Sequence, residues 1–172
     1  MIRDTGYTVW FAPKDNDLKK RLTKCISTLT QRRESVAFHP HVTLLSLPDA
    51  SLYEAKRVMK ELQIDHTTIQ LSFGNSIETR GTYFQCLFVP IISSISLVVA
   101  RQQSLAITRI EESKFMPHLS LLYDELSQSD FEILSQEIIE LFNTEKLFGS
   151  KQIFTLELWH TEGYADEWYR IN

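Results

Sequence analysis

Two histidines stand in the same local sequence at two places in this chain of 172 residues. FHPHVTLLS covers residues 38–46 and FMPHLSLLY covers residues 115–123, so His41 and His118 share the same neighbours in the same order. An imidazole gains or loses a proton near neutral pH, and a neutral histidine and a protonated one can serve together as base and acid. The repeat therefore indicates one site for acid–base chemistry.

A hydroxyl residue follows each histidine by two positions. Residues i and i+2 of an extended strand lie on one face, so His41 lies beside Thr43 and His118 beside Ser120. Two such pairs around one anion suit metal-free hydrolysis of a phosphodiester. One histidine activates water, the other protonates the leaving oxygen, and the hydroxyls hydrogen-bond the phosphoryl oxygens. These four residues are the predicted catalytic residues.

Other chemistries find less support in the sequence. His39 and His41 could form a metal pair, but the second copy has Met116 in the position of His39. Cys25 and Cys86 form no CxxC motif, and the five glycines form neither a dinucleotide-binding motif nor a P-loop. We therefore predict that the enzyme uses neither a metal nor a cofactor.

Composition limits the partners and the compartment. A net charge of −4 argues against binding a long nucleic acid, which usually needs a basic surface. The longest apolar stretch, residues 86–100, is interrupted by Pro90 and serines and is too short to span a bilayer. Two cysteines fit a reducing compartment, and no secretion signal is evident. We expect a cytoplasmic monomer with one domain, residues 1–172.

Strand and helix patterns alternate along the chain and must position these residues. Predicted strands cover residues 7–13, 41–47, 68–74, 82–89, 118–123 and 153–161, and predicted helices cover about 18–29, 52–62 and 95–107, with another after a capping box at 129–132. Each motif strand leads to a turn with Asp and then to a capped helix. The chain thus reads as two similar halves, and a pseudo-twofold axis between them would bring His41 and His118 into one cleft.

The two motifs, together with YTVWFAP, TYFQCLF, MPHLSLLYDEL and HTEG, resemble the two-histidine phosphoesterase superfamily. Within it, the chain is most similar to the plant and fungal cyclic phosphodiesterases that act on ADP-ribose 1″,2″-cyclic phosphate, a by-product of tRNA splicing. The resemblance implies a bilobal α+β fold in which two antiparallel sheets line a central cleft and helices pack outside. It also implies that Trp10, Tyr83 and Tyr123 line the pocket for a small cyclic nucleotide or an ADP-ribose cyclic phosphate.

Several alternatives stay open at this point. Trp10 and Tyr83 could be ordinary core aromatics. The chain could be an RNA-end-processing member of the superfamily, or a nucleotide-binding module without activity. The near-symmetry of the motifs does not distinguish base from acid; we favour His118 as the base and His41 as the acid.

Overall fold

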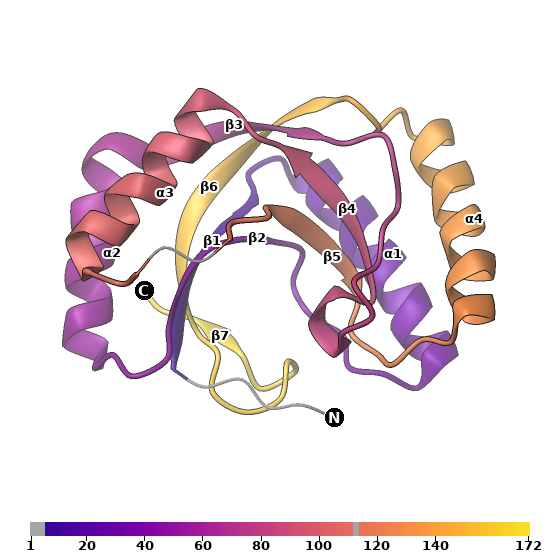
Figure 1. Cartoon of the computed structure of the whole chain (residues 1–172), viewed down its shortest axis with the longest axis horizontal. Coiled ribbons are helices and arrows are strands. Elements are labelled where there is room, and N and C mark those ends of the chain that lie inside the picture. Colours follow the sequence, from indigo (N-terminus) through magenta and orange to yellow (C-terminus); the bar gives the residue numbers. More distant parts are fainter. Residues whose placement is uncertain (1–5, 112–113) are drawn as a thin grey trace.

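The computed structural model describes residues 6–111 and 114–172, apart from the side chains of 64–66, and strands and helices alternate along them (Figure 1). The elements are β1 (Tyr7–Pro13), α1 (Asn16–Arg33), β2 (Val42–Leu47), α2 (Leu52–His66), β3 (Thr68–Phe73), the short 3₁₀ helix η1 (Tyr83–Gln85), β4 (Leu87–Ile92), α3 (Ile95–Thr108), β5 (His118–Leu122), α4 (Gln128–Thr144), β6 (Lys151–His160) and β7 (Tyr169–Arg170). The predicted α+β class is confirmed.

The described strands form one antiparallel sheet that closes on itself. Its order is β1-β2-β5-β4-β3-β6-β7, and β1 also pairs with β6. The two halves are the strand triplets β6-β1-β2 and β3-β4-β5, joined through β3–β6 pairing and through one residue pair, Val42 with Leu119, between β2 and β5. The two sheets implied by the resemblance are thus continuous with one another, because backbone pairing bridges the halves on both sides.

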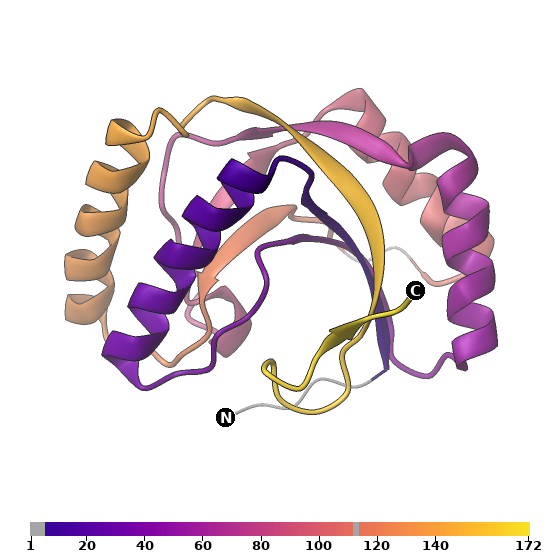
Figure 2. The same cartoon turned by 180° about the vertical axis from the view of Figure 1, so that it is seen from behind.

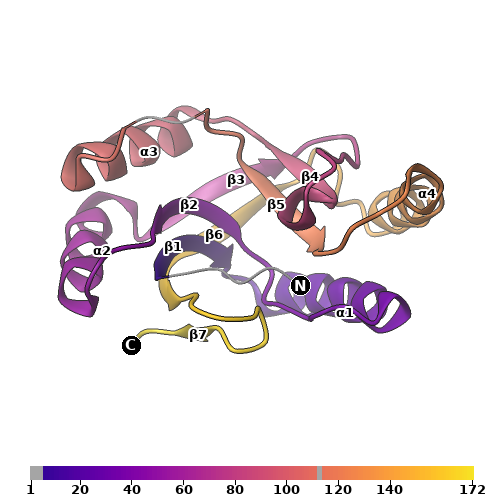
Figure 3. The ribbon, with the colours of Figure 1, turned by 60° about the horizontal axis from the view of Figure 1, so that its bottom comes forward.

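Helices cover this sheet in two pairs. Helices α2 and α3 lie together on one side of the strands, and α1 and α4 lie on the other (Figures 1 and 2). Figure 3 shows the same division from below, with α2 and α3 at the left and α1 and α4 at the right. Within the described ranges, no helix combines the length and the apolar character needed to cross a membrane.

The helices begin where side chains satisfy their free N–H groups. The predicted capping box of α2 is present: the Ser51 hydroxyl accepts from the Glu54 N–H, and the Glu54 carboxylate accepts from the Ser51 N–H. Helix α4 is capped by Ser127, which accepts from the Asp130 N–H at 3.1 Å, rather than by Ser129 as predicted. Ser127 has the extended backbone angles of an N-cap residue, φ −68° and ψ 160°, whereas Ser129 lies inside the first turn of α4.

The predicted strand at 82–89 is only partly correct. Residues Tyr83–Gln85 form the 3₁₀ helix η1, and the strand begins at Leu87. Aromatic residues favour strands, but here both rings of η1 pack on Tyr123: Tyr83 is tilted at 6.2 Å between centroids, and Phe84 is edge-on at 5.1 Å. This turn brings Phe84 and Gln85 to the end of β5, where the second motif lies.

Candidate active site

A cavity of about 280 Å³ brings residues of the two motifs together. All four predicted catalytic residues, His41, Thr43, His118 and Ser120, line it. The complete set of described lining residues is Thr8, Trp10, His41, Thr43, Ser46, Phe84, Gln85, His118, Ser120, Tyr123 and Trp168. The alternate residues of the motifs, such as Val42 and Leu119, are fully buried in the hydrophobic core.

Both imidazoles are held in the same way. Nδ1 of His41 lies 2.7 Å from the His39 carbonyl oxygen, and Nδ1 of His118 lies 2.8 Å from the Met116 carbonyl oxygen. A carbonyl oxygen only accepts hydrogen bonds, so Nδ1 carries the proton in each ring. In both copies Nε2 is therefore the nitrogen left to exchange a proton with a ligand.

Burial makes both histidines easier to deprotonate. The pKa of His41 is lowered to about 3: removal from water is the largest cause, the bond to the His39 carbonyl opposes it, and the nearby His118 adds to the lowering. Removal from water also lowers the pKa of His118, while its bond to the Met116 carbonyl raises it. His41 is 6% exposed and His118 is half-buried, so removal from water disfavours a positive charge on His41 more strongly than on His118.

A β-bulge interrupts the first motif strand just after its hydroxyl residue. Val9 of β1 pairs with Leu45 of β2. The next residue, Trp10, pairs with Thr43, so the register passes over Leu44. A bulge of this kind adds one residue to one strand and changes the face on which the following residues lie.

The second motif strand carries a bulge at the equivalent position. Leu87 of β4 pairs with Leu122 of β5, whereas the next residue, Phe88, pairs with Ser120. The register therefore passes over Leu121, the residue after the hydroxyl residue in this copy too.

The two bulges decide which motif residues reach the cavity. Strict alternation from His41 and His118 would place the second leucine of each copy toward the ligand. Instead both leucines of each copy are buried in the core, and the residue after them, Ser46 or Tyr123, lines the cavity. In both motifs the bulge thus lies at the first residue of the Leu-Leu pair. Because the strand changes face there, Tyr123 lines the cavity.

The two hydroxyl residues differ in their surroundings. Ser120 is 5% exposed, and its Oγ donates a hydrogen bond to the Phe84 carbonyl oxygen at 3.1 Å. Thr43 is half-buried and stands opposite Trp10 in the β1–β2 pairing. A phosphoryl oxygen would compete with the Phe84 carbonyl for the Ser120 proton.

The aromatic residues predicted to line the pocket take three different positions. Trp10 is 2% exposed and stacks on the His41 ring, with centroids 3.6 Å apart and planes 9° apart, so it belongs to the cavity wall and to the core. Tyr123 lines the cavity and stacks on Phe38 at 3.8 Å. Tyr83 is not among the described lining residues and packs on Phe84 at 5.2 Å.

Several lining residues were not predicted from the sequence: Thr8, Ser46, Phe84 and Trp168, whereas Gln85 was only a weaker candidate for the pocket. Thr8 pairs with Ser46 across β1 and β2. The bulge that turns Ser46 toward the cavity therefore also brings Thr8 to it. Phe84 and Gln85 depend on a turn that the sequence favoured as a strand. Trp168 lies near the end of the sequence, far from both motifs, so no local pattern indicated that it lines the same cavity.

A metal pair of His39 with His41 was weighed on sequence and not favoured, and in the structure the two residues are connected in another way. The His39 ring packs against Trp159, with centroids 4.7 Å apart, while the His39 carbonyl holds His41. Across residues 6–111 and 114–172, no group of three or more His, Cys, Asp or Glu residues lies close enough together to hold a metal ion.

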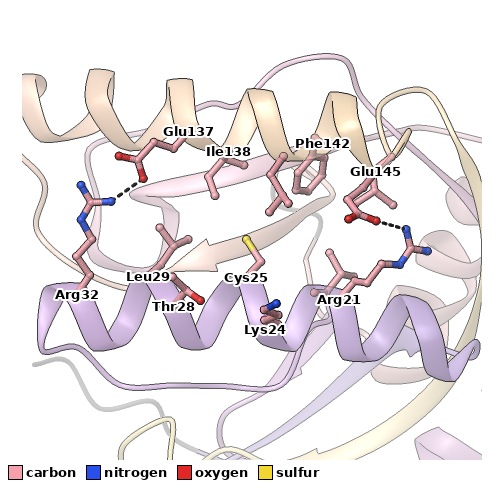
Figure 4. Close-up of a pocket in the computed structure, with 13 residues that line it drawn as sticks. Arg21, Lys24, Cys25, Thr28, Leu29, Arg32, Glu137, Ile138, Phe142 and Glu145 are labelled. Atoms are coloured by element: carbon pink, nitrogen blue, oxygen red, sulfur yellow. Dashed lines mark hydrogen bonds and ion pairs between the residues drawn. The ribbon is translucent and has the colours of Figure 1, made fainter.

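A larger cavity, of about 370 Å³, lies between α1 and α4 (Figure 4). Its described lining is mostly apolar, and ion pairs from Arg21 to Glu145 and from Arg32 to Glu137 connect the helices beside it. Cys25 points into it, and burial raises the pKa of that thiol to about 12, which makes it a poor nucleophile. The histidine cavity is smaller but holds the groups that can do chemistry.

Comparison with known proteins connects the whole described region to one family. The model of a family described as cyclic phosphodiesterase-like protein matches residues 5–172. A cyclic phosphodiesterase of Arabidopsis thaliana is 28% identical over 130 residues, which cover 75% of this chain and 71% of that protein. A solved structure of Usb1 from Kluyveromyces marxianus covers 96% of both chains at 13% identity and a TM-score of 0.46, a distant likeness.

Proposed function

The chain belongs to the family of cyclic phosphodiesterase-like proteins, and we propose that it opens small cyclic phosphodiesters by hydrolysis, with His41 and His118 as the two proton-transfer groups. The matched hydrogen bonds of the two imidazoles carry this proposal. Each Nδ1–H is tied to a carbonyl two residues earlier, and each Nε2 is left for the ligand. Such an arrangement suits in-line attack on phosphorus, in which base and acid act from opposite sides.

The hydroxyl groups complete the proposed mechanism. Thr43 and Ser120 donate hydrogen bonds to the phosphoryl oxygens as negative charge increases on them in the transition state. Burial lowers the pKa of both histidines below 6.5, so both are mainly neutral in the free enzyme at neutral pH. The bound phosphate anion raises both pKa values and allows one histidine to become the acid.

Burial supports an assignment of roles that differs from the one favoured on sequence. His41 has the more strongly lowered pKa, so it suits the neutral base that takes a proton from water. His118 is more exposed, so it suits the protonated acid, which donates a proton to the leaving ribose oxygen. A substrate with a 4-nitrophenolate leaving group distinguishes the two roles, since that group leaves without a proton. The variant that lacks the acid should recover most of its lost rate on that substrate.

The cavity suits a small substrate with a ribose cyclic phosphate. Its volume lies near the lower end of the range for ligand pockets, and its aromatic wall offers faces on which a base or ribose can stack. We propose ADP-ribose 1″,2″-cyclic phosphate as a substrate, giving ADP-ribose 1″-phosphate, and nucleoside 2′,3′-cyclic phosphates as others, giving 2′-phosphates. The net charge of −4 supports small substrates over RNA ends.

Product analysis tests this proposal directly. The purified protein is incubated with 2′,3′-cyclic AMP, ADP-ribose 1″,2″-cyclic phosphate and an oligonucleotide with a 2′,3′-cyclic phosphate end, and products are identified by phosphorus NMR. Turnover of the small substrates to one phosphomonoester isomer is the expected result. Cleavage of the oligonucleotide alone would identify an RNA-end-processing enzyme, and tight binding without turnover would identify a binding module.

A further inference from the structure

A buried arginine of α3 contacts the first motif strand at its bulge. Arg101 is 8% exposed, and its Nη1 donates a hydrogen bond of 2.7 Å to the carbonyl oxygen of Leu44. Leu44 is the residue that the β1–β2 register passes over, between Thr43 and Leu45. The extra residue of a bulge is left out of the ladder of backbone hydrogen bonds. Arg101 thus donates a hydrogen bond to the Leu44 carbonyl at the bulge, where the side chains of β2 switch from one face of the sheet to the other.

The same guanidinium contacts the other motif. Its carbon lies over the ring of Phe115, 4.9 Å from the centroid, at the distance of a cation–π contact. Phe115 opens the second motif, three residues before His118, while Leu44 follows Thr43 directly. Between them, β2 and β5 share one residue pair, so their backbones do little to fix the spacing of the two motifs. Arg101 connects Leu44 of β2 to Phe115 in the segment just before β5, in addition to that single residue pair.

The other motif phenylalanine makes a corresponding contact in the opposite direction. Phe38, three residues before His41, stacks on Tyr123, which ends the second motif. The phenylalanine of each motif therefore contacts the other motif. Phe38 packs directly on Tyr123, and Phe115 is connected to Leu44 through Arg101.

We propose that Arg101 is a positioning residue, which fixes Thr43 and Ser46 on one strand relative to His118 on the other by holding the bulge carbonyl of Leu44 and packing on Phe115. Thr43 directly precedes the bulge residue Leu44, Ser46 follows it by two positions, and both line the histidine cavity. The kinetic consequence rests on the proposed function, since it concerns the geometry of that same site.

The test compares three variants on a cyclic nucleotide, with rates expressed per folded protein. Arg101→Met keeps the length of the side chain but removes its donors and charge, so kcat should fall by about 10²-fold, the scale of a small misplacement of reacting groups, while KM changes little. Arg101→Lys keeps a donor and a charge and should retain at least about ten times more kcat than the methionine variant. Ser104→Ala is the control, because Ser104 is also buried on α3 but its hydroxyl donates to the Arg101 carbonyl within the helix.

The outcomes separate positioning from mere stability. A lower melting temperature in Arg101→Met with unchanged kcat per folded molecule would overturn the proposal, as would equal kcat losses in Arg101→Met and Ser104→Ala or in Arg101→Met and Arg101→Lys. If Arg101→Met does not fold, Phe115→Leu replaces it. This variant should also lower kcat and not KM, and an unchanged kcat would count against the bridge.

A second readout does not require turnover. In NMR spectra of the unliganded protein, Arg101→Met should shift or broaden the Thr43 methyl and His118 ring signals, whereas Ser104→Ala should leave them in place. If the wild-type protein opens no cyclic phosphate, the proposed function has failed while these spectra still test the bridge. Unchanged signals in Arg101→Met would refute it.

Discussion

Replacing His41 with asparagine should make the protein less sensitive to acid. The asparagine amide nitrogen can take the place of Nδ1 and keep the hydrogen bond to the His39 carbonyl, but it cannot be protonated. In the wild type, burial lowers the pKa of His41 from 6.5 to about 3, so the folded protein resists a proton that the unfolded chain accepts. The change therefore isolates the contribution of this one imidazole to stability.

The sign and size follow from proton linkage. Below pH 6.5 the unfolded chain binds a proton at His41, whereas the folded protein binds it only near pH 3, so the free energy of unfolding falls as the pH falls through this window. The slope approaches about 1.4 kcal/mol per pH unit. Between pH 6 and pH 4.5, the wild type should therefore lose about 2 kcal/mol relative to His41→Asn.

Urea unfolding followed by tryptophan fluorescence measures this difference. Both proteins are unfolded at pH 7, 6, 5 and 4.5 at constant ionic strength, and the free energy in water is extrapolated for each. Carboxylates that titrate in this range affect both proteins and cancel in the comparison. Parallel pH dependences would refute the view that burial keeps His41 neutral.

Further predictions concern the rest of the site. Trp10→Ala should lower the free energy of unfolding by about 3–5 kcal/mol, because it empties a buried position against His41; a change below 1 kcal/mol in urea unfolding would contradict this. Tyr123→Ala should raise KM more than it lowers kcat, and an unchanged KM would leave Tyr123 a packing role only. Thr43→Ala and Ser120→Ala should each lower kcat by about 10²-fold or more while preserving both limbs of the pH profile. Dialysis against EDTA should leave turnover intact, and a loss restored by zinc or manganese would rule out the metal-free mechanism.

Local sequence patterns predicted most of the framework. The two motif strands, the α2 capping box and the buried face of α1 each depend on residues a few positions apart, which is the range over which periodicity and capping act. The meeting of His41 with Thr43 and of His118 with Ser120 in one cavity could also be predicted, because these residues precede the bulges, where strict alternation still holds.

The rest depended on contacts between distant segments. The bulges at Leu44 and Leu121 arise from pairing with β1 and β4, so neither motif alone reveals that its last residue turns toward the cavity. Trp168 reaches the site because β6 pairs with β1 and the chain then folds back so that β7 pairs with β6. Arg101 looks like an ordinary polar residue of α3 until the fold places the Leu44 carbonyl and Phe115 beside it.

The pH dependence of turnover tests the two-histidine mechanism most directly. For the wild type, kcat/KM should be bell-shaped, with the bell shifted to lower pH than that of kcat, because burial lowers both pKa values in the free enzyme and a bound anion raises them. His41→Ala and His118→Ala should each remove one limb and cost about 10² to 10⁴-fold, and the double variant should lose far less than the product of the two. A folded single variant with full activity, or an unchanged bell in either one, would contradict the shared site.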